Sequence, residues 1–154
     1  MAQPVHAPKL YERDFVAWCE ETIAKLKAHD LESLDLDSLI EEIEGLAGRD
    51  RRELESRLQV LLEHLLKRLY VSSPYDHRGW QNTIHEQRRE LRLLLKQSPS
   101  LRNYLTNVFD EAWQNALTQV KRDYAKELFP DQWPFSGDID ALLDNQFWLA
   151  DEDL

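Results

Sequence analysis

The chain has 154 residues, a formal net charge of −10, a hydrophobic fraction of 42% and a single cysteine, Cys19. This length predicts one domain with a buried core, and one cysteine excludes an intramolecular disulfide, as suits a reducing compartment. No apolar run approaches the ~20 residues that span a bilayer, and none precedes a cleavage site near the N-terminus. We therefore expect a cytoplasmic globular protein with neither a membrane segment nor a signal peptide.

The charge is distributed unevenly along the chain. Residues 1–48 carry four basic and eleven acidic residues, residues 49–102 carry twelve and seven, and residues 103–154 carry three and eleven. The net charges of the three segments are therefore −7, +5 and −8. A basic middle between acidic ends has two interpretations. Either the middle helices neutralise the outer ones within one bundle, or the basic segment binds an anionic partner.

The spacing of apolar residues predicts an all-α protein. Residues 1–10 contain two prolines and no periodic pattern, so we expect a flexible tail there. Gly45, Gly48 and Asp50 predict a break or kink between the second and third helices. Ser98 and Pro99 predict a helix start. The predicted helices cover residues 11–28, 35–48, 54–71, 80–97 and 98–128, followed by a short helix over 139–143 and a frayed acidic end over 150–154.

The predicted helix over residues 54–71 organises the others, because it carries the longest apolar stripe in the chain. Leucines recur every three to four residues along it, at Leu54, Leu58, Leu61, Leu62, Leu65 and Leu69. We expect an antiparallel bundle of about five helices plus a short C-terminal helix or flap, in which Phe147 and Trp148 pack back. This bundle is predicted to form a single helical domain over residues 11–149.

Carboxylates line the edge of the second predicted stripe, which covers residues 36–47. On a helical wheel Glu44 borders the stripe, Glu41 lies further out on the same side, and Glu42 lies on the other side. Two carboxylates three residues apart suit a divalent cation or an acid–base pair. They suit interhelical ion pairs equally well, and such pairs are the ordinary role of glutamate at a stripe edge.

His64 lies on a mixed flank of the organising helix, beside Arg57, Val60 and Arg68. This flank has the composition of a second packing surface or of an anion site. The histidine itself is expected to make a structural hydrogen bond.

The stretch over residues 80–92 combines an aromatic side chain, Trp80, with a polar row. His85, Arg88, Arg89 and Arg92 are spaced so that they lie on one side of a helix, which suits contact with phosphate or RNA. In the alternative interpretation, Arg57 and Arg88 pair with Glu41 and Glu44 across the bundle, since arginine binds carboxylates in a bidentate manner. Gln87 falls on the inward face of the same helix and requires a polar partner there.

Catalytic and cofactor signatures are absent from the sequence. It contains no HExxH, no Walker motif, no GxGxxG, no nucleophile elbow and no Glu-x-x-His pair of the di-iron bundles. We therefore predict no cofactor and no metal. A metal-dependent enzyme that uses Glu41, Glu44, His64 and His85 is the weakest of the interpretations, because those side chains would have to converge on one ion.

Several segments together resemble one family. They are LDLDSLIEEIEGLAGRDRRELESRLQVLLEHLLKRLY at residues 34–70, GWQNTIHEQRREL at 79–91, SPSL at 98–101, FPDQWPF at 129–135 and LLD at 142–144. In this order they resemble the bacterial domain of unknown function 29 family, which is especially numerous in cyanobacteria. The resemblance covers residues 11–147, although Trp133 stands where the family often has a cysteine. It implies an α-helical fold and no particular activity, and its pattern falls on Glu41, Glu42, Glu44, His64, Leu65, Leu66, Lys67, Trp80, Ile84, Arg88, Ser98, Pro99 and Ser100.

Two functional interpretations follow from the sequence. The first is a non-enzymatic cytoplasmic helical protein that binds another protein, or a second copy of itself, through polar–apolar flanks beyond those needed for one core. The second is nucleic-acid or nucleotide binding, with or without nuclease activity, through the basic helices of residues 49–102. The second requires its basic residues to converge on one exposed face: Arg51, Arg52, Arg57, His64, Arg68, His85, Arg88, Arg89 and Arg92.

Overall fold

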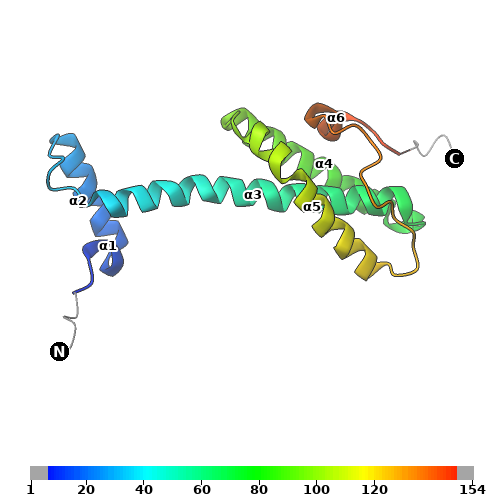
Figure 1. Ribbon diagram of the computed structural model, residues 1–154, viewed down its shortest axis with the longest axis horizontal. Coiled ribbons are helices and arrows are strands. Elements are labelled where there is room, and N and C mark those ends of the chain that lie inside the picture. Colours follow the sequence, from blue (N-terminus) through cyan, green and yellow to red (C-terminus); the bar gives the residue numbers. More distant parts are fainter. Residues whose placement is uncertain (1–6, 149–154) are drawn as a thin grey trace. The chain divides into compact units, whose positions relative to one another are not determined.

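The computed structural model describes residues 7–148. Within that range the chain forms six α-helices and no strand (Figure 1), which confirms the predicted all-α helical bundle. The helices are α1 Leu10–Arg13, α2 Phe15–Lys27, α3 Leu36–Tyr70, α4 Pro74–Gln97, α5 Leu101–Asp123 and α6 Ile139–Asp144. Most of the predicted tail, and the whole of the predicted frayed end over 150–154, lie outside the described residues.

The chain divides into two compact units, residues 1–47 and residues 48–154. We refer to them as the N-terminal unit and the C-terminal unit. The N-terminal unit contains α1, α2 and the first part of α3, and the rest of α3 belongs to the C-terminal unit together with α4, α5 and α6. A single folding domain over residues 11–149 stays a prediction.

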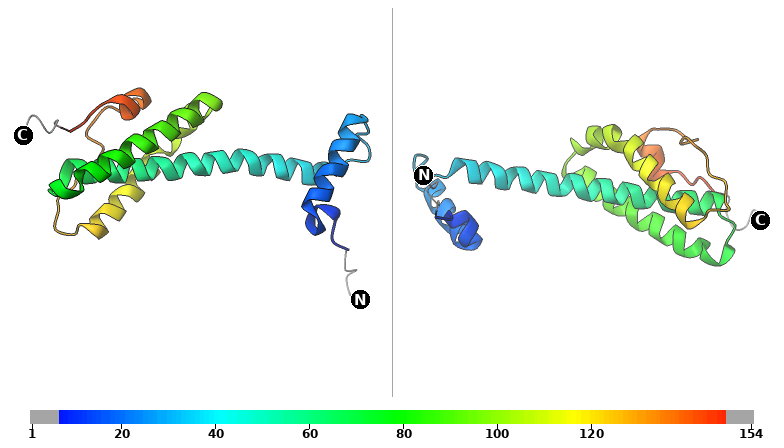
Figure 2. Two further views of the ribbon diagram at one scale, coloured as in Figure 1. Left: turned by 180° about the vertical axis from the view of Figure 1, so that it is seen from behind. Right: turned by 60° about the horizontal axis from the view of Figure 1, so that its bottom comes forward.

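The core of the C-terminal unit is built on the leucine stripe of α3. Leu54, Leu58, Leu61, Leu62 and Leu65 are 0% exposed, which confirms that this part of the stripe faces inward. Leu69, the last residue of the predicted stripe, is only partly buried. Each fully buried leucine stabilises the fold by about 1.5–3 kcal/mol relative to an exposed one. Side chains of α4, α5 and α6 complete this core, and the three helices gather around the second part of α3 (Figure 2). Phe147 and Trp148 pack against it as predicted.

The N-terminal unit buries much less. Asp14 begins α2 by accepting a hydrogen bond from the Ala17 backbone N–H at 3.1 Å. Trp18 is the one hydrophobic residue of this unit, within its described residues, that is buried. Its ring contacts Tyr11, with 4.7 Å between the ring centroids, and the Tyr11 hydroxyl donates to Glu42 Oε2 at 2.8 Å. These contacts attach α1 and α2 to the start of α3.

The predicted break at Gly48–Asp50 is wrong, because α3 continues without interruption from Leu36 to Tyr70. A glycine costs about 1 kcal/mol relative to alanine inside a helix. Helix propagation adds a hydrogen bond for every further residue, so two glycines do not stop a helix that is anchored on both sides of them. By contrast, the predicted first helix is divided in two at Asp14, where α1 ends and α2 begins.

Other helix boundaries also differ from their predictions. The residues expected to form a turn at 75–79 belong to α4, which begins at Pro74 with proline in its first turn. The Ser73 hydroxyl supports this start by donating to Asp76 Oδ2 at 2.6 Å. The last long helix, α5, begins at Leu101 rather than directly after Ser98 and ends at Asp123 rather than near residue 128.

Candidate functional site

Arg88 of α4 joins that helix to the C-terminal segment. Its side chain is 4% exposed, and Nε donates to the Leu142 carbonyl at 3.0 Å while Nη2 donates to the Asn145 carbonyl at 2.6 Å. These carbonyls lie at the C-terminal end of α6, where backbone acceptors have no partner within the helix. Burial lowers the pKa of Arg88 to about 10, so the guanidinium stays charged at neutral pH. The charge also suits the negative end of the helix dipole.

Two further arginines hold the same segment. Arg92 donates through Nη2 to the Leu143 carbonyl and, at 2.8 Å, to Asp144 Oδ1. Arg102 of α5 pairs with Asp140 at 2.7 Å. The acidic α6 is therefore attached to basic residues of α4 and α5, as expected if the basic middle of the chain neutralises an acidic end. These contacts give Arg88 and Arg92 a structural role.

Arg68 of α3 is also buried, at 8% exposure, and lies 5.6 Å from the centre of the Trp148 ring. When the Gln81 amide is oriented with its oxygen toward Arg68, it accepts from Arg68 Nε at 2.8 Å and from Trp148 Nε1 at 3.2 Å. The end of the described chain is thus held from α3 as well as from α4.

The expected pairing of Arg57 and Arg88 with Glu41 and Glu44 is wrong. Arg57 instead donates to Glu53 at 2.9 Å and to Gln87 Oε1 at 3.2 Å, and Arg88 binds backbone carbonyls. The bond from Arg57 provides the polar partner that Gln87 requires.

Arg89 follows the same rule as Arg57, because it pairs with glutamates of its own helix. Its guanidinium lies 2.8 Å from Glu86 and 2.8 Å from Glu90. Each of the predicted anion-contact residues on α3 and α4 has a partner within the chain, although the pairs of Arg89 and Arg92 lie at the surface: Arg57, Arg68, Arg89 and Arg92. Of the residues that nucleic-acid binding would require on one exposed face, Arg51, Arg52, Arg89 and Arg92 are exposed, whereas Arg68 and Arg88 are buried.

His64 makes the structural hydrogen bond expected of it, since its Nδ1 lies 2.8 Å from the Val60 carbonyl one turn earlier in α3. Burial lowers the pKa of His64, and the bond to Val60 opposes that shift only in part. His85 is exposed on α4. Trp80 is half-buried and packs edge-on against Tyr124, with 6.2 Å between the ring centroids. Among residues 7–148, no three His, Cys, Asp or Glu side chains are grouped so that they could hold a metal ion.

Glu41 and Glu44 are exposed on α3 in the N-terminal unit, and so is Asp37. Within the described part of the chain these three carboxylates have neither a hydrogen bond nor an ion pair. Glu42 differs from them, because it accepts the hydrogen bond from Tyr11, which raises the pKa of Tyr11 to about 12. Glu42 is therefore a structural residue of the N-terminal unit.

Large apolar side chains are exposed beside these carboxylates. Among residues 7–148, twelve large hydrophobic residues are at least 41% exposed, and nine of them lie between Phe15 and Leu46. On α3, Leu36, Ile40 and Ile43 recur at spacings of four and three residues and, with Ala47, form what we call the apolar row. On α2, Val16, Ile23 and Leu26 form a second row. The sequence predicts the stripe of residues 36–47 but gives no sign that it stays uncovered.

The C-terminal unit has a shallow open groove between α3 and α5. Polar side chains line most of it, among them Arg52, Glu55, Gln59 and Glu111. Glu55 accepts a hydrogen bond from the Tyr104 hydroxyl, which raises the pKa of Tyr104.

The fold and these sites define an all-α helical protein that carries uncovered apolar rows on its N-terminal unit. No helix in the described range is long and apolar enough to cross a membrane. The chain belongs to the family described as Domain of unknown function DUF29, whose model matches residues 10–148. No curated protein and no solved structure matches the chain.

Proposed function

We propose that this chain is a non-enzymatic protein of the bacterial cytoplasm that binds another protein through its N-terminal unit. The observation that carries the proposal is the concentration of exposed apolar side chains between Phe15 and Leu46, where nine of the twelve are found. Groups of exposed apolar side chains are typical of interaction sites in soluble proteins.

The size of the N-terminal unit supports this proposal. It has 47 residues, and Trp18 is the only buried hydrophobic side chain among those described. Units this small rarely bury enough apolar surface to be stable by themselves. Eight side chains on α2 and α3 are each about half exposed, and covering each of them would contribute about 1 kcal/mol. A partner that covers both rows therefore completes a core that the unit lacks.

Site-specific photo-cross-linking in cells of the native host tests the proposal. A photoreactive amino acid placed at Ile40 or Ile23 is expected to form cross-links to a second protein chain. The same amino acid at Asn107, an exposed position of α5, serves as the control. Cross-links from Ile40 that stay within the chain, or that match those from Asn107, would contradict the proposal.

A further inference from the structure

We propose that the apolar row of α3 binds an amphipathic helix of another protein that carries Lys or Arg beside its own apolar stripe. This inference rests on the proposed function and adds the chemistry of the partner. The spacing of the row, the carboxylates beside it and the charge of the N-terminal unit all favour such a partner.

The spacing of the row fits a helix as the occupant. Leu36, Ile40, Ile43 and Ala47 follow one another at four, three and four residues, the alternation by which two helices pack side by side. Leu36, Ile40 and Ile43 are between 52% and 57% exposed, so the row is open along its length. A partner helix that docks along such a row presents apolar anchors at the same spacing.

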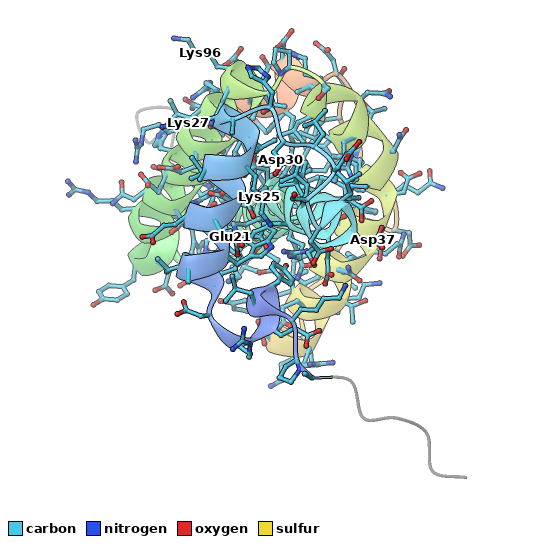
Figure 3. The ribbon with its side chains drawn as sticks, turned by 90° about the vertical axis from the view of Figure 1, so that its left-hand side faces the viewer. Glu21, Lys25, Lys27, Asp30, Asp37 and Lys96 are labelled. Carbon is cyan, nitrogen blue, oxygen red and sulfur yellow. The ribbon has the colours of Figure 1, made fainter. Side chains whose placement is uncertain are left out.

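A row of carboxylates runs along one edge of the apolar row. Asp37, Glu41 and Glu44 each follow a residue of the apolar row, so they lie about 100° further around the helix. We call them the acidic row. Figure 3 shows Asp37 on the side of α3 that faces away from α2. Glu21 and Lys25 lie together on α2, on the opposite side. A helix docked on the apolar row would place its flanking side chains beside these carboxylates.

Within residues 7–148, the carboxylates that lie beside the apolar row have no partner, in contrast to three other carboxylates of the N-terminal unit. Asp35 accepts from the Ser38 hydroxyl at 2.5 Å, Glu42 accepts from Tyr11, and Glu21 lies 3.4 Å from Lys25. Asp37, Glu41 and Glu44 have no such contact within the described range. Their charges are therefore available to a partner, and cations at the flanks of its helix complement them.

The charge of the unit distinguishes this partner from a second copy of the chain. Residues 7–47 carry four basic and eleven acidic residues, a net charge of −7. Association of two such units would bring like charges together, and their repulsion opposes it. Added salt screens this repulsion and would strengthen a dimer. A cationic helix shows the opposite dependence, because salt weakens its attraction to the acidic row.

Designed peptides and the full-length protein test the inference. Three helical peptides are compared by fluorescence anisotropy: one with an apolar stripe flanked by Lys, one with the same stripe flanked by Glu, and one with the Lys content kept but the stripe scrambled. We expect only the first to bind, and we expect its affinity to fall as ionic strength rises. Equal binding of the Lys-flanked and Glu-flanked peptides would overturn the inference.

Two variants that each remove three negative charges test whether the peptide binds at the acidic row. The variant D37N/E41Q/E44Q removes the acidic row and is expected to weaken the Lys-flanked peptide by about tenfold. The control variant E12Q/E32Q/D110N alters the same residue types at exposed positions that have no ion pair or side-chain hydrogen bond in the described structure. It should leave the affinity almost unchanged, and equal losses in both variants would overturn the inference.

Apolar variants complete the experiment. Ile40→Gln with Ile43→Gln should abolish peptide binding, whereas Leu93→Gln with Leu128→Gln, which alters exposed apolar residues of the C-terminal unit, should not. Circular dichroism checks that all variants stay helical. Sedimentation that reveals a dimer dependent on Ile40, and strengthened by salt, would identify a second copy as the occupant and overturn the inference.

The failure of this inference is distinguishable from failure of the proposed function. If Ile40 forms cross-links to another protein in cells but no Lys-flanked peptide binds, the cationic helix is wrong and the proposed function stands. If Ile40 cross-links only within its own chain, both fail.

Discussion

The two units of the chain contain similar apolar stripes on the same helix, yet one stripe is covered and the other is open. In the C-terminal unit six leucines of α3, from Leu54 to Leu66, are 0% exposed, whereas Ile40 and Ile43 in the N-terminal unit are more than half exposed. Three other helices, α4, α5 and α6, contribute to the core around the leucines. An apolar stripe on a helix is therefore stable only when something covers it, and the number of neighbouring elements decides whether the same chain provides that cover.

The largest expected contrast between the units is in local stability. Amide groups of α3 between Leu58 and Leu66 should exchange hydrogen only on global unfolding, because their side chains form the centre of the core. Amide groups of α2 should exchange through local opening at much lower free energy, because Trp18 and Thr22 are the only buried side chains of that helix. Hydrogen exchange followed by mass spectrometry measures both. Equal protection of the two helices would contradict an incomplete N-terminal core.

Alanine substitution should separate the two stripes in energy. Leu61→Ala leaves a cavity in the core and is expected to lower the free energy of unfolding by about 2–5 kcal/mol. Ile43→Ala removes an exposed side chain and should change it by no more than about 0.5 kcal/mol. Urea denaturation of the purified protein measures both values. A large loss for Ile43→Ala would mean that its side chain is covered within the chain.

The next largest effect on the free energy of unfolding is expected from Arg88. Arg88→Ala leaves the carbonyls of Leu142 and Asn145 without their donor and removes a buried side chain, which should cost about 2–4 kcal/mol. Limited proteolysis should then cut within α6 first. Arg92→Ala is the matched control, because Arg92 is exposed and its ion pair with Asp144 should contribute less than about 1 kcal/mol. Equal effects of the two substitutions would contradict the assignment of Arg88 as the main attachment of α6.

Glycine substitutions in α3 give smaller effects of the opposite sign. A Cβ at Gly45 meets no atom within 4 Å, so Gly45→Ala should raise the free energy of unfolding by about 0.4–1 kcal/mol. A Cβ at Gly48 would lie 3.2 Å from Arg52 Nη1, so the gain from Gly48→Ala should be smaller because that side chain must move. Thermal unfolding of the two variants side by side compares them. Destabilisation by Gly45→Ala would indicate that α3 is interrupted there in solution.

The smallest expected effect is the pH dependence contributed by His64. In the folded chain, burial lowers the pKa of His64 below its ordinary value of 6.5. The unfolded chain therefore binds the proton first as the pH falls. The stability from neutral His64 is therefore fully present above about pH 6.5 and is lost as the pH falls through the folded pKa. His64→Gln should make the urea midpoint of unfolding depend less steeply on pH in this range. An unchanged slope would show that the histidine titrates alike in both states.

Periodicity predicted most of the fold but not the partners of its polar residues. The leucine stripe of α3, the short helix α6 and the packing of Phe147 and Trp148 all follow from local patterns, and all three agree with the structure. The pairing of Arg57 and Arg88 with Glu41 and Glu44 does not agree. Arg88 binds carbonyls that lie 54 and 57 residues further along the chain. Backbone acceptors carry no residue type that a sequence pattern can reveal.

The amino-acid sequence was sufficient to predict that this protein is all-α, where the apolar stripes of its helices lie, and to which family the chain belongs. These properties depend on residue type and on spacing within a few turns, which local physics decides. The three-dimensional arrangement was needed to see that the leucines of α3 from Leu54 to Leu66 are covered while Ile40 and Ile43 stay open, and that Arg88 is a structural residue. Burial depends on elements distant in the chain, so two similar stripes on one helix have different environments.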